Sequence, residues 1–369
     1  MLQDVLDYNT KCGYSLVRIC NGKNPMHITP AKGHSVLQKL LVLFIVLSSY
    51  MHLASPLIFE SLVIGGGAAV AYYMRCKMYE CCDDDTIPRS TNRLLHDMKF
   101  KLYGQQIAKD LVFSAIHSHV FHSNPRKPLV LSFHGLPGSG KNYVVSMIAN
   151  ALYKKGEKSS HYHFFNGRSD FPNDHKVALY RFELDQKIKN ALSACPRSMF
   201  VFDEVDKMPA GVLDTLVPFL DYTSWNNNEK SKAIFIFLSN TGSDQIVNRM
   251  LHLWINGKSR NDVTIRDFES LIELGAFNEK GGLYKSGTIE SKLIDHHVPF
   301  LPMEEEHVRQ CIIDAFKHWG TGNPSDDLIK EVLKHVTYGP PPHNLYSTSG
   351  CKKLDHKVSF VLFGKEFDD

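Results

Sequence analysis

The sequence predicts an α/β fold: a parallel sheet flanked by helices, followed by a small helical domain at the C-terminal end. Three short apolar runs, residues 127–134, 198–203 and 233–239, are typical of buried parallel strands. The first run leads through a glycine-rich loop into the apolar, periodic stretch from Tyr143 to Tyr153, which predicts a helix. This order of strand, loop and helix is typical of parallel α/β sheets.

Length and charge narrow the class of protein further. The chain has 369 residues, enough for two or three domains of about 150 residues each. Lys and Arg number 42 and Asp and Glu 39, so the formal net charge is only +3. We expect no nucleic-acid partner, because proteins that coat nucleic acid carry a large positive excess. Hydrophobic residues make up 43% of the chain, which excludes wholesale disorder.

The N-terminal part concentrates apolar residues in two segments. Lys39 precedes the apolar run 40–47, and small residues follow it, a pattern typical of a secretory signal or signal anchor within residues 1–56. Residues 57–74 form a second apolar stretch, which predicts membrane association either as one span or as an embedded hairpin. The acidic residues 83–85 then predict a linker, so we expect a membrane-associated segment and linker over 57–85.

The loop after the first strand has the pattern of a phosphate-binding loop, Gly135-Leu-Pro-Gly-Ser-Gly-Lys-Asn142. Backbone N–H groups of such a loop surround the β-phosphate, and the helix N-terminus favours the negative charge. The position that usually carries a Ser or Thr ligand of Mg²⁺ is Asn142, whose amide oxygen can also bind a hard cation. The expected nucleotide-binding residues of this loop are Gly135, Gly138, Ser139, Gly140, Lys141 and Asn142.

Polar residues follow the other two strands. Asp203 and Glu204 end the second strand, where the first would hold Mg²⁺ with Asn142 and the second would polarise the attacking water. Asn240 ends the third strand and can position that water. The carboxyl ends of parallel strands meet at one edge of a sheet, so we expect these groups to lie beside Lys141. This series favours an AAA+ P-loop ATPase over a simple P-loop kinase.

Several motifs point to a known family: Gly140-Lys-Asn142, Asp203-Glu-Val-Asp-Lys-Met208, Phe237-Leu-Ser-Asn-Thr-Gly242, Val298-Pro-Phe-Leu-Pro302, Gly350-Cys-Lys352 and Glu80-Cys-Cys82. These motifs resemble those of torsins, the AAA+ ATPases of the endoplasmic reticulum lumen. The similarity covers about residues 75–355. The resemblance implies a large nucleotide-binding domain over 86–297 and a small helical domain over 298–369.

The resemblance also implies roles for single residues. Lys141 and Asn142 correspond to Walker A, Asp203 and Glu204 to Walker B, and Asn240 to sensor 1. Lys352 corresponds to sensor 2, so Glu204, Asn240 and Lys352 are the expected catalytic residues. Cys311 and Cys351 match the family's C-terminal pair, and a bridge between them would be either a stabilising disulfide or a redox-linked sensor.

The same resemblance implies an activity that depends on a partner. Torsins lack an arginine finger, and membrane proteins of the lamina-associated-polypeptide type supply one in trans from a luminal domain. We therefore expect slow hydrolysis of ATP with Mg²⁺ in the lumen of the endoplasmic reticulum and nuclear envelope, activated by such a partner and used to remodel membrane or protein complexes. A homo-oligomer of this chain is also compatible with these expectations. The alternatives are a nucleotide-switched interaction protein with little turnover and, less favoured, a ring-forming unfoldase.

Other residues carry weaker signals. His117, His119 and His122 have a spacing that could suggest a metal site, but we expect a solvated helix end. Cys195 is expected to be a buried packing residue, and Arg249 and Arg260 to be surface residues rather than arginine fingers.

Overall fold

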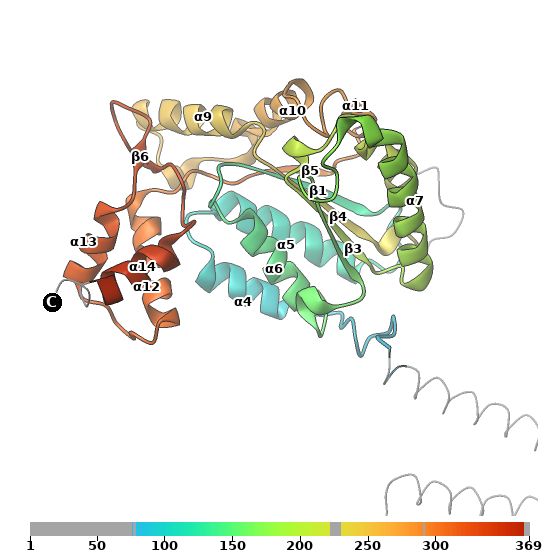
Figure 1. The fold of residues 1–369 in the computed structure, drawn as a ribbon, viewed down its shortest axis with the longest axis horizontal. Helices are drawn as coiled ribbons and strands as arrows, with labels where there is room; N and C mark the ends of the chain where they lie inside the picture. The colour runs from blue at the N-terminus through green and yellow to red at the C-terminus, as the bar shows by residue number, and fades with distance from the viewer. Residues whose placement is uncertain (1–75, 77–78, 222–229, 291, 365–369) are drawn as a thin grey trace, which may run out of the picture. The chain divides into compact units, whose positions relative to one another are not determined.

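The computed structural model describes residues 76, 79–221, 230–290 and 292–364 (Figure 1). The predicted targeting segment and the apolar stretch 57–74 lie outside these described residues. Within the described ranges, no helix is long and apolar enough to cross a membrane.

A five-stranded parallel sheet forms the centre of the large domain, in the order β2-β3-β4-β1-β5. The three strands predicted from apolar runs are confirmed as β1, β3 and β4, and the structure adds β2 and β5. The strand bounds are β1 Leu129–His134, β2 Tyr162–Asn166, β3 Met199–Asp203, β4 Ile234–Ser239 and β5 His296–Pro299.

Successive side chains of each strand point to opposite faces of the sheet, so the core is divided into two parts, one on each face. Phe200 and Phe202 of β3 contact Phe235 and Phe237 of β4 on one face, with ring centroids 4.8 and 5.4 Å apart. Met199, Val201, Ile234 and Ile236 point to the other face and belong to a separate buried cluster. Both faces are apolar, so these strands are continuous hydrophobic runs, as expected for a parallel sheet covered on both sides.

Helices cover both faces. In Figure 1, α4, α5 and α6 lie along one face, and α7 lies along the other. The helix bounds in this domain are α4 Asn92–Lys101, α5 Gln106–Phe121, α6 Lys141–Leu152, α7 Val177–Ala194, α8 Val217–Leu220, α9 Ser243–Ile255, α10 Glu269–Asn278 and α11 Gly287–Glu290. The helix predicted from Tyr143 begins two residues earlier, directly after Gly140, which has a left-handed backbone with φ of 106°.

The C-terminal helical domain is confirmed and has its own core. Its elements are α12 Glu305–His318, α13 Asp326–Lys334, α14 Leu354–Phe363 and a two-stranded antiparallel ribbon of β6 Tyr338–Gly339 and β7 Tyr346–Ser347. This core begins at Met303 and includes Val308, Ile312 and Phe316 of α12. The boundary expected at 297/298 runs through β5, which pairs with β1 in the large sheet.

Three disulfides connect the described cysteines: Cys76–Cys81, Cys82–Cys195 and Cys311–Cys351. The bridge expected between Cys311 and Cys351 is present. Cys195 is buried in the core as expected, but it is also bonded to Cys82, a disulfide that the sequence analysis missed. This bond joins the segment before α4 to the loop before β3. The histidines of α5 form no metal-binding group among the described residues, and His117 instead bonds to Thr91 over 2.7 Å.

Candidate nucleotide-binding site

A pocket of about 550 Å³ lies between the carboxyl edge of the sheet and the small domain. Its volume is within the range of about 300–1,000 Å³ that is usual for ligand sites. The structure brings nearly all of the predicted site residues to this pocket. Its lining includes Gly138, Ser139, Gly140, Lys141, Asn142, Asp203, Glu204, Asn240, Cys311, Cys351 and Lys352. Gly135 does not line the pocket, but its carbonyl oxygen contacts the side chain of Lys141.

Lys141 is buried at the start of α6 and is held by the loop itself. Its Nζ donates to the carbonyl oxygens of Gly135 and Leu136, at 2.5 and 3.1 Å, and to Oδ1 of Asn240 at 3.0 Å. Burial lowers the pKa of Lys141 to about 8, although nearby Asp203 and Asp206 act in the opposite direction. All three acceptors are neutral oxygens. A phosphate would be a stronger acceptor for the ammonium group and could replace them.

Asn142 and Asp203, the two predicted Mg²⁺ ligands, contact each other directly. Nδ2 of Asn142 donates to Oδ2 of Asp203 over 2.9 Å. The two side chains come from the start of α6 and the end of β3, so the structure places them at one point of the sheet edge. A metal ion between them would replace this hydrogen bond and require the amide oxygen of Asn142 to turn toward the ion.

Glu204 follows β3 with a left-handed backbone, φ 51°, which is uncommon for a residue other than glycine. Its Oε2 lies 3.1 Å from Nε of Arg168, an ion pair that sequence reasoning missed. Gly167 makes this approach possible, because a Cβ at that position would lie 2.2 Å from the carbonyl oxygen of Glu204. The expected general base is thus engaged by a cation from the loop after β2.

Asn240 is oriented by groups on two neighbouring elements. Its backbone N–H donates to Oδ1 of Asp206 over 3.1 Å, and its side-chain oxygen accepts from Lys141. The next residue, Thr241, is fixed through its carbonyl oxygen, which lies 3.1 Å from Nδ1 of His134. His134 is fully buried at the end of β1, and burial lowers its pKa to about 3, so the ring is neutral. Asp206 and His134 are positioning residues that the sequence analysis did not single out.

The small domain contacts the phosphate-binding loop through backbone groups. The N–H of Cys351 donates to the carbonyl oxygen of Gly138 over 3.0 Å. A Cβ on Gly138 would lie 2.0 Å from the carbonyl oxygen of Ser349, and one on Gly350 would lie 2.3 Å from that of Gly138. The two glycines therefore allow this close approach. Lys352 follows directly and lines the pocket beside Lys141, whose pKa it helps to lower.

A buried glutamine links the loop to the connection between the domains. The side-chain amide of Gln105 donates to the carbonyl oxygens of Ser139 and Leu301, at 3.1 and 2.8 Å, and its oxygen accepts from the N–H of Leu301 at 2.8 Å. The neighbouring Tyr103 donates to Asp314 of α12. Because these contacts span up to 211 residues of sequence, no local pattern indicated them.

The chain is similar to known proteins over most of its length. A family model described as Torsin matches residues 76–202, and one described as Torsin-1A, C-terminal domain, matches residues 303–361. A protein of Drosophila melanogaster named Torsin-like protein is 39% identical over 315 residues, which are 82% of this chain and 93% of the relative. A Torsin-like protein of Caenorhabditis elegans is 38% identical over 306 residues, 80% of this chain and 86% of the relative.

The chain belongs to the torsin family. A solved structure of the Saccharomyces cerevisiae Hsp104-ADP complex matches this torsin with a TM-score of 0.52 and 19% sequence identity. The match covers 75% of this chain and 48% of the Hsp104 chain, so the torsin spans about half of that protein. At this level of identity the likeness concerns the fold alone, and it agrees with the predicted AAA+ architecture.

Arg249 and Arg260, the two arginines after Asn240 that the sequence analysis considered as fingers, are both engaged in contacts within the fold. Arg260 is not a surface residue as expected: its side chain is 11% exposed, and it binds Oε1 of Glu304 at 2.7 Å and the carbonyl oxygen of Gly104 at 2.6 Å. Arg249 is half-buried and pairs with Asp267 at 3.2 Å. Both side chains connect parts of the fold, which explains their presence without a catalytic role.

The donors and acceptors of the pocket fit a nucleoside triphosphate with a divalent cation. The loop offers backbone N–H groups at the start of α6, and Lys141 and Lys352 offer two ammonium groups. The carboxylate of Asp203 and the amide oxygen of Asn142 are the hard oxygen ligands that Mg²⁺ prefers. Glu204 and Asn240 lie at the same edge and could contact a water molecule near the terminal phosphate.

Proposed function

We propose that this torsin-family protein binds ATP with Mg²⁺ in the pocket between its two domains and hydrolyses it. The observation that carries the proposal is the convergence of Lys141, Asp203, Glu204, Asn240 and Lys352, from four separate places in the sequence, on one cavity. Asp203 and Asn142 would hold the metal ion, which would neutralise charge on the phosphates. Glu204 would polarise the attacking water, with Asn240 positioning it.

We also propose that hydrolysis is slow in the isolated chain and depends on a partner. Two observations support this. Arg249 and Arg260 are both committed to structural ion pairs, and Glu204 is engaged by Arg168. An arginine supplied in trans by a membrane protein of the lamina-associated-polypeptide type would stabilise the charge that develops on the transferred phosphate. Each round of hydrolysis would then assemble and release a complex with that partner and so remodel membrane or protein assemblies.

The proposed location is the lumen of the endoplasmic reticulum and nuclear envelope, at the membrane. The signal-like residues 1–56 and the apolar stretch 57–74 support it. Three disulfides among the described residues also favour an oxidising compartment, because disulfides are rare in the reducing cytosol.

Steady-state ATP turnover of the purified full chain tests this proposal, measured alone and with the luminal domain of a lamina-associated-polypeptide partner. We expect turnover to rise at least about a hundredfold with the partner, since arginine fingers supply about 10³–10⁵ in rate. Glu204→Gln should remain inactive in both samples. If the isolated chain turns over ATP rapidly and Glu204→Gln abolishes this turnover, the proposed ATPase activity stands and the proposed dependence on a partner is overturned.

A nucleotide-switched interaction protein is the second candidate function. Asn142 favours it, because its amide nitrogen faces Asp203 where other ATPases have a hydroxyl ligand of the metal. In that case ATP would strengthen binding of the partner, while the wild-type chain with the partner would turn over no faster than Glu204→Gln.

A further inference from the structure

A second pocket lies at the opposite, amino-terminal edge of the sheet. Its volume is about 50 Å³. Arg197 contributes from just before β3, and Lys232 and Ile234 from the start of β4. His119 and His122 contribute from the end of α5. The nucleotide pocket is built at the carboxyl ends of the same strands, so the two sites share no lining residue.

The lining of this pocket is cationic. Arg89, Arg197 and Lys232 supply the positive charge, and no carboxylate is among the described lining residues. His119 also lines the pocket, but burial lowers its pKa and favours the neutral ring. Asp84 pairs with Arg197 at 2.6 Å and with Arg89 at 3.6 Å, but its side chain is 67% exposed and lies outside the lining. Lys232 has no ion pair with any residue that the structure describes. The pocket is thus suited to an anion.

The volume of the pocket limits the size of the anion that it can hold. A cavity of about 50 Å³ holds about three to five water molecules, if each needs about 10–15 Å³ of such volume. That is enough for a phosphate group but far too small for a nucleotide. The remaining lining includes Ile87, Leu152 and Tyr153, which are apolar and buried and could contact the carbon atoms next to the phosphate.

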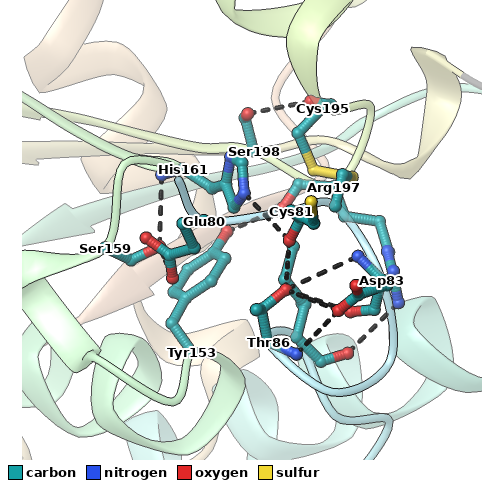
Figure 2. The surroundings of a disulfide bond; sticks show 12 residues. Glu80, Cys81, Asp83, Thr86, Tyr153, Ser159, His161, Cys195, Arg197 and Ser198 are labelled. Atoms are coloured by element: carbon teal, nitrogen blue, oxygen red, sulfur yellow. Dashed lines mark hydrogen bonds between the residues drawn. A yellow bond between two sulfur atoms is a disulfide. The ribbon is translucent and has the colours of Figure 1, made fainter. Parts of the chain in front are cut away.

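The pocket is lined in part by the segment that follows the apolar stretch in the sequence, through Ile87, Pro88 and Arg89. That stretch ends at Met74, and Cys76 is bonded to Cys81. Cys82 is in turn bonded to Cys195, two residues before Arg197. Figure 2 shows the surroundings of this disulfide, where Arg197 accepts a hydrogen bond from Tyr153 at its carbonyl oxygen and Ser198 donates to the carbonyl oxygen of Cys195. Basic residues close to a membrane segment attract anionic lipids.

We propose that this pocket binds the phosphate group of an anionic lipid headgroup. Arg89, Arg197 and Lys232 contact the phosphate oxygens, and the apolar lining contacts the glycerol carbons. The site goes beyond the proposed ATPase function, since it uses none of the nucleotide-binding residues. It would hold the ATPase domain against the membrane by a contact that does not depend on the apolar stretch.

Titration calorimetry tests the site directly, on the full chain kept soluble in an amphipathic polymer and without nucleotide. The probes are dihexanoyl phosphatidic acid, dihexanoyl phosphatidylcholine and inorganic phosphate, with heats from the polymer alone subtracted. We expect phosphatidic acid to bind at least about tenfold more tightly than phosphatidylcholine, because each basic residue near a lipid surface adds to the attraction. The double variant Arg89→Gln/Lys232→Gln should lose most of this affinity.

Arg126→Gln/Lys158→Gln is the matched control, because it removes the same two charges at exposed positions that do not line the pocket. The proposal is overturned if phosphatidic acid and phosphatidylcholine bind equally, or if the pocket variant binds like the control. If inorganic phosphate binds as tightly as phosphatidic acid, the pocket is a phosphate site, but the proposal that its ligand is a lipid headgroup is overturned. Both variants should bind ATP with the affinity of the wild type. That result would show that they are folded and would keep a failure of the lipid site distinguishable from a failure of the proposed ATPase.

Discussion

The backbone N–H of Cys351 donates a 3.0 Å hydrogen bond to the carbonyl oxygen of Gly138. One partner belongs to the phosphate-binding loop and the other to the Cys311–Cys351 disulfide of the small domain. The shape of the nucleotide pocket therefore depends on how the segment 349–352 is held against the loop. Two predictions test this dependence.

We expect Gly350→Ala to weaken ATP binding by at least about tenfold. Gly350 has φ 53°, and a Cβ there would lie 2.3 Å from the carbonyl oxygen of Gly138, so the segment must move away from the loop. Gly320→Ala is the control, because Gly320 has φ 83° and open space around it. Both variants have the backbone cost of about 1–2 kcal/mol, but only the first should change ATP affinity. Equal affinities for the two variants would contradict the proposed contact.

Cys311→Ser should lower both stability and ATP affinity. The disulfide closes a loop with a sequence separation of 40 residues, which the chain-entropy model values at about 4 kcal/mol in the free energy of unfolding. Its loss also frees Cys351 to shift from Gly138. Chemical denaturation measures the first effect, and equilibrium ATP binding under oxidising conditions measures the second. If the ATP affinity of Cys311→Ser is unchanged, the Cys311–Cys351 disulfide stabilises the fold without affecting the nucleotide pocket.

ATP affinity should fall as the pH rises above 8. Burial lowers the pKa of Lys141 to about 8 in the free protein, whereas phosphate binding needs the charged form. Between pH 7.5 and 9 we expect a loss of up to about eightfold, measured by equilibrium binding. The effect on folding has the opposite sign: the folded pKa lies below the unfolded value of 10.5, so the free protein gains stability as pH rises from 8 to 10.5. Constant affinity over this range would contradict a lowered pKa of the buried Lys141.

Arg168→Ala should raise ATP turnover of the isolated chain. The ion pair holds Glu204 at 3.1 Å from Arg168 and competes with the attacking water for that carboxylate. Because the arginine is 68% exposed, the pair is worth at most about 1 kcal/mol, so we expect an increase of up to about fivefold. Arg181→Ala is the control, an exposed arginine that bonds to Thr215 instead. An equal or lower rate in Arg168→Ala than in the control would show that the pair does not restrain Glu204.

The sequence predicted those parts of the fold that have local signals. The strands β1, β3 and β4 are continuous apolar runs, and the glycine loop identifies the start of α6. The strands β2 and β5 were not predicted. β2 lies at an edge with an exposed Phe164 and little burial, and β5 has only four residues, so neither has a clear period.

Most site residues were identified because each follows a strand or belongs to a motif. The residues that position them were missed, since their roles come from contacts across the chain. Asp206 lies in a recognised motif, but its bond to Asn240 depends on the pairing of β3 with β4. Cys195 is followed by Pro196 at a helix end, a position that favours a buried packing residue, and nothing in that local pattern indicates a disulfide. The expectation of an oxidising compartment, together with the even number of cysteines, was the signal that could have suggested its bond to Cys82.

The most direct test of the central claim is a single-turnover experiment with the full chain, limiting labelled ATP and Mg²⁺, following bound ATP and ADP together. We predict that Glu204→Gln binds ATP as tightly as wild type but forms ADP at least about a hundredfold more slowly, the usual contribution of a general base. Lys141→Ala should bind no ATP at the same concentration. ADP formation by Glu204→Gln at the wild-type rate, or ATP binding that survives Lys141→Ala, would contradict the assignment of this pocket as the ATPase site.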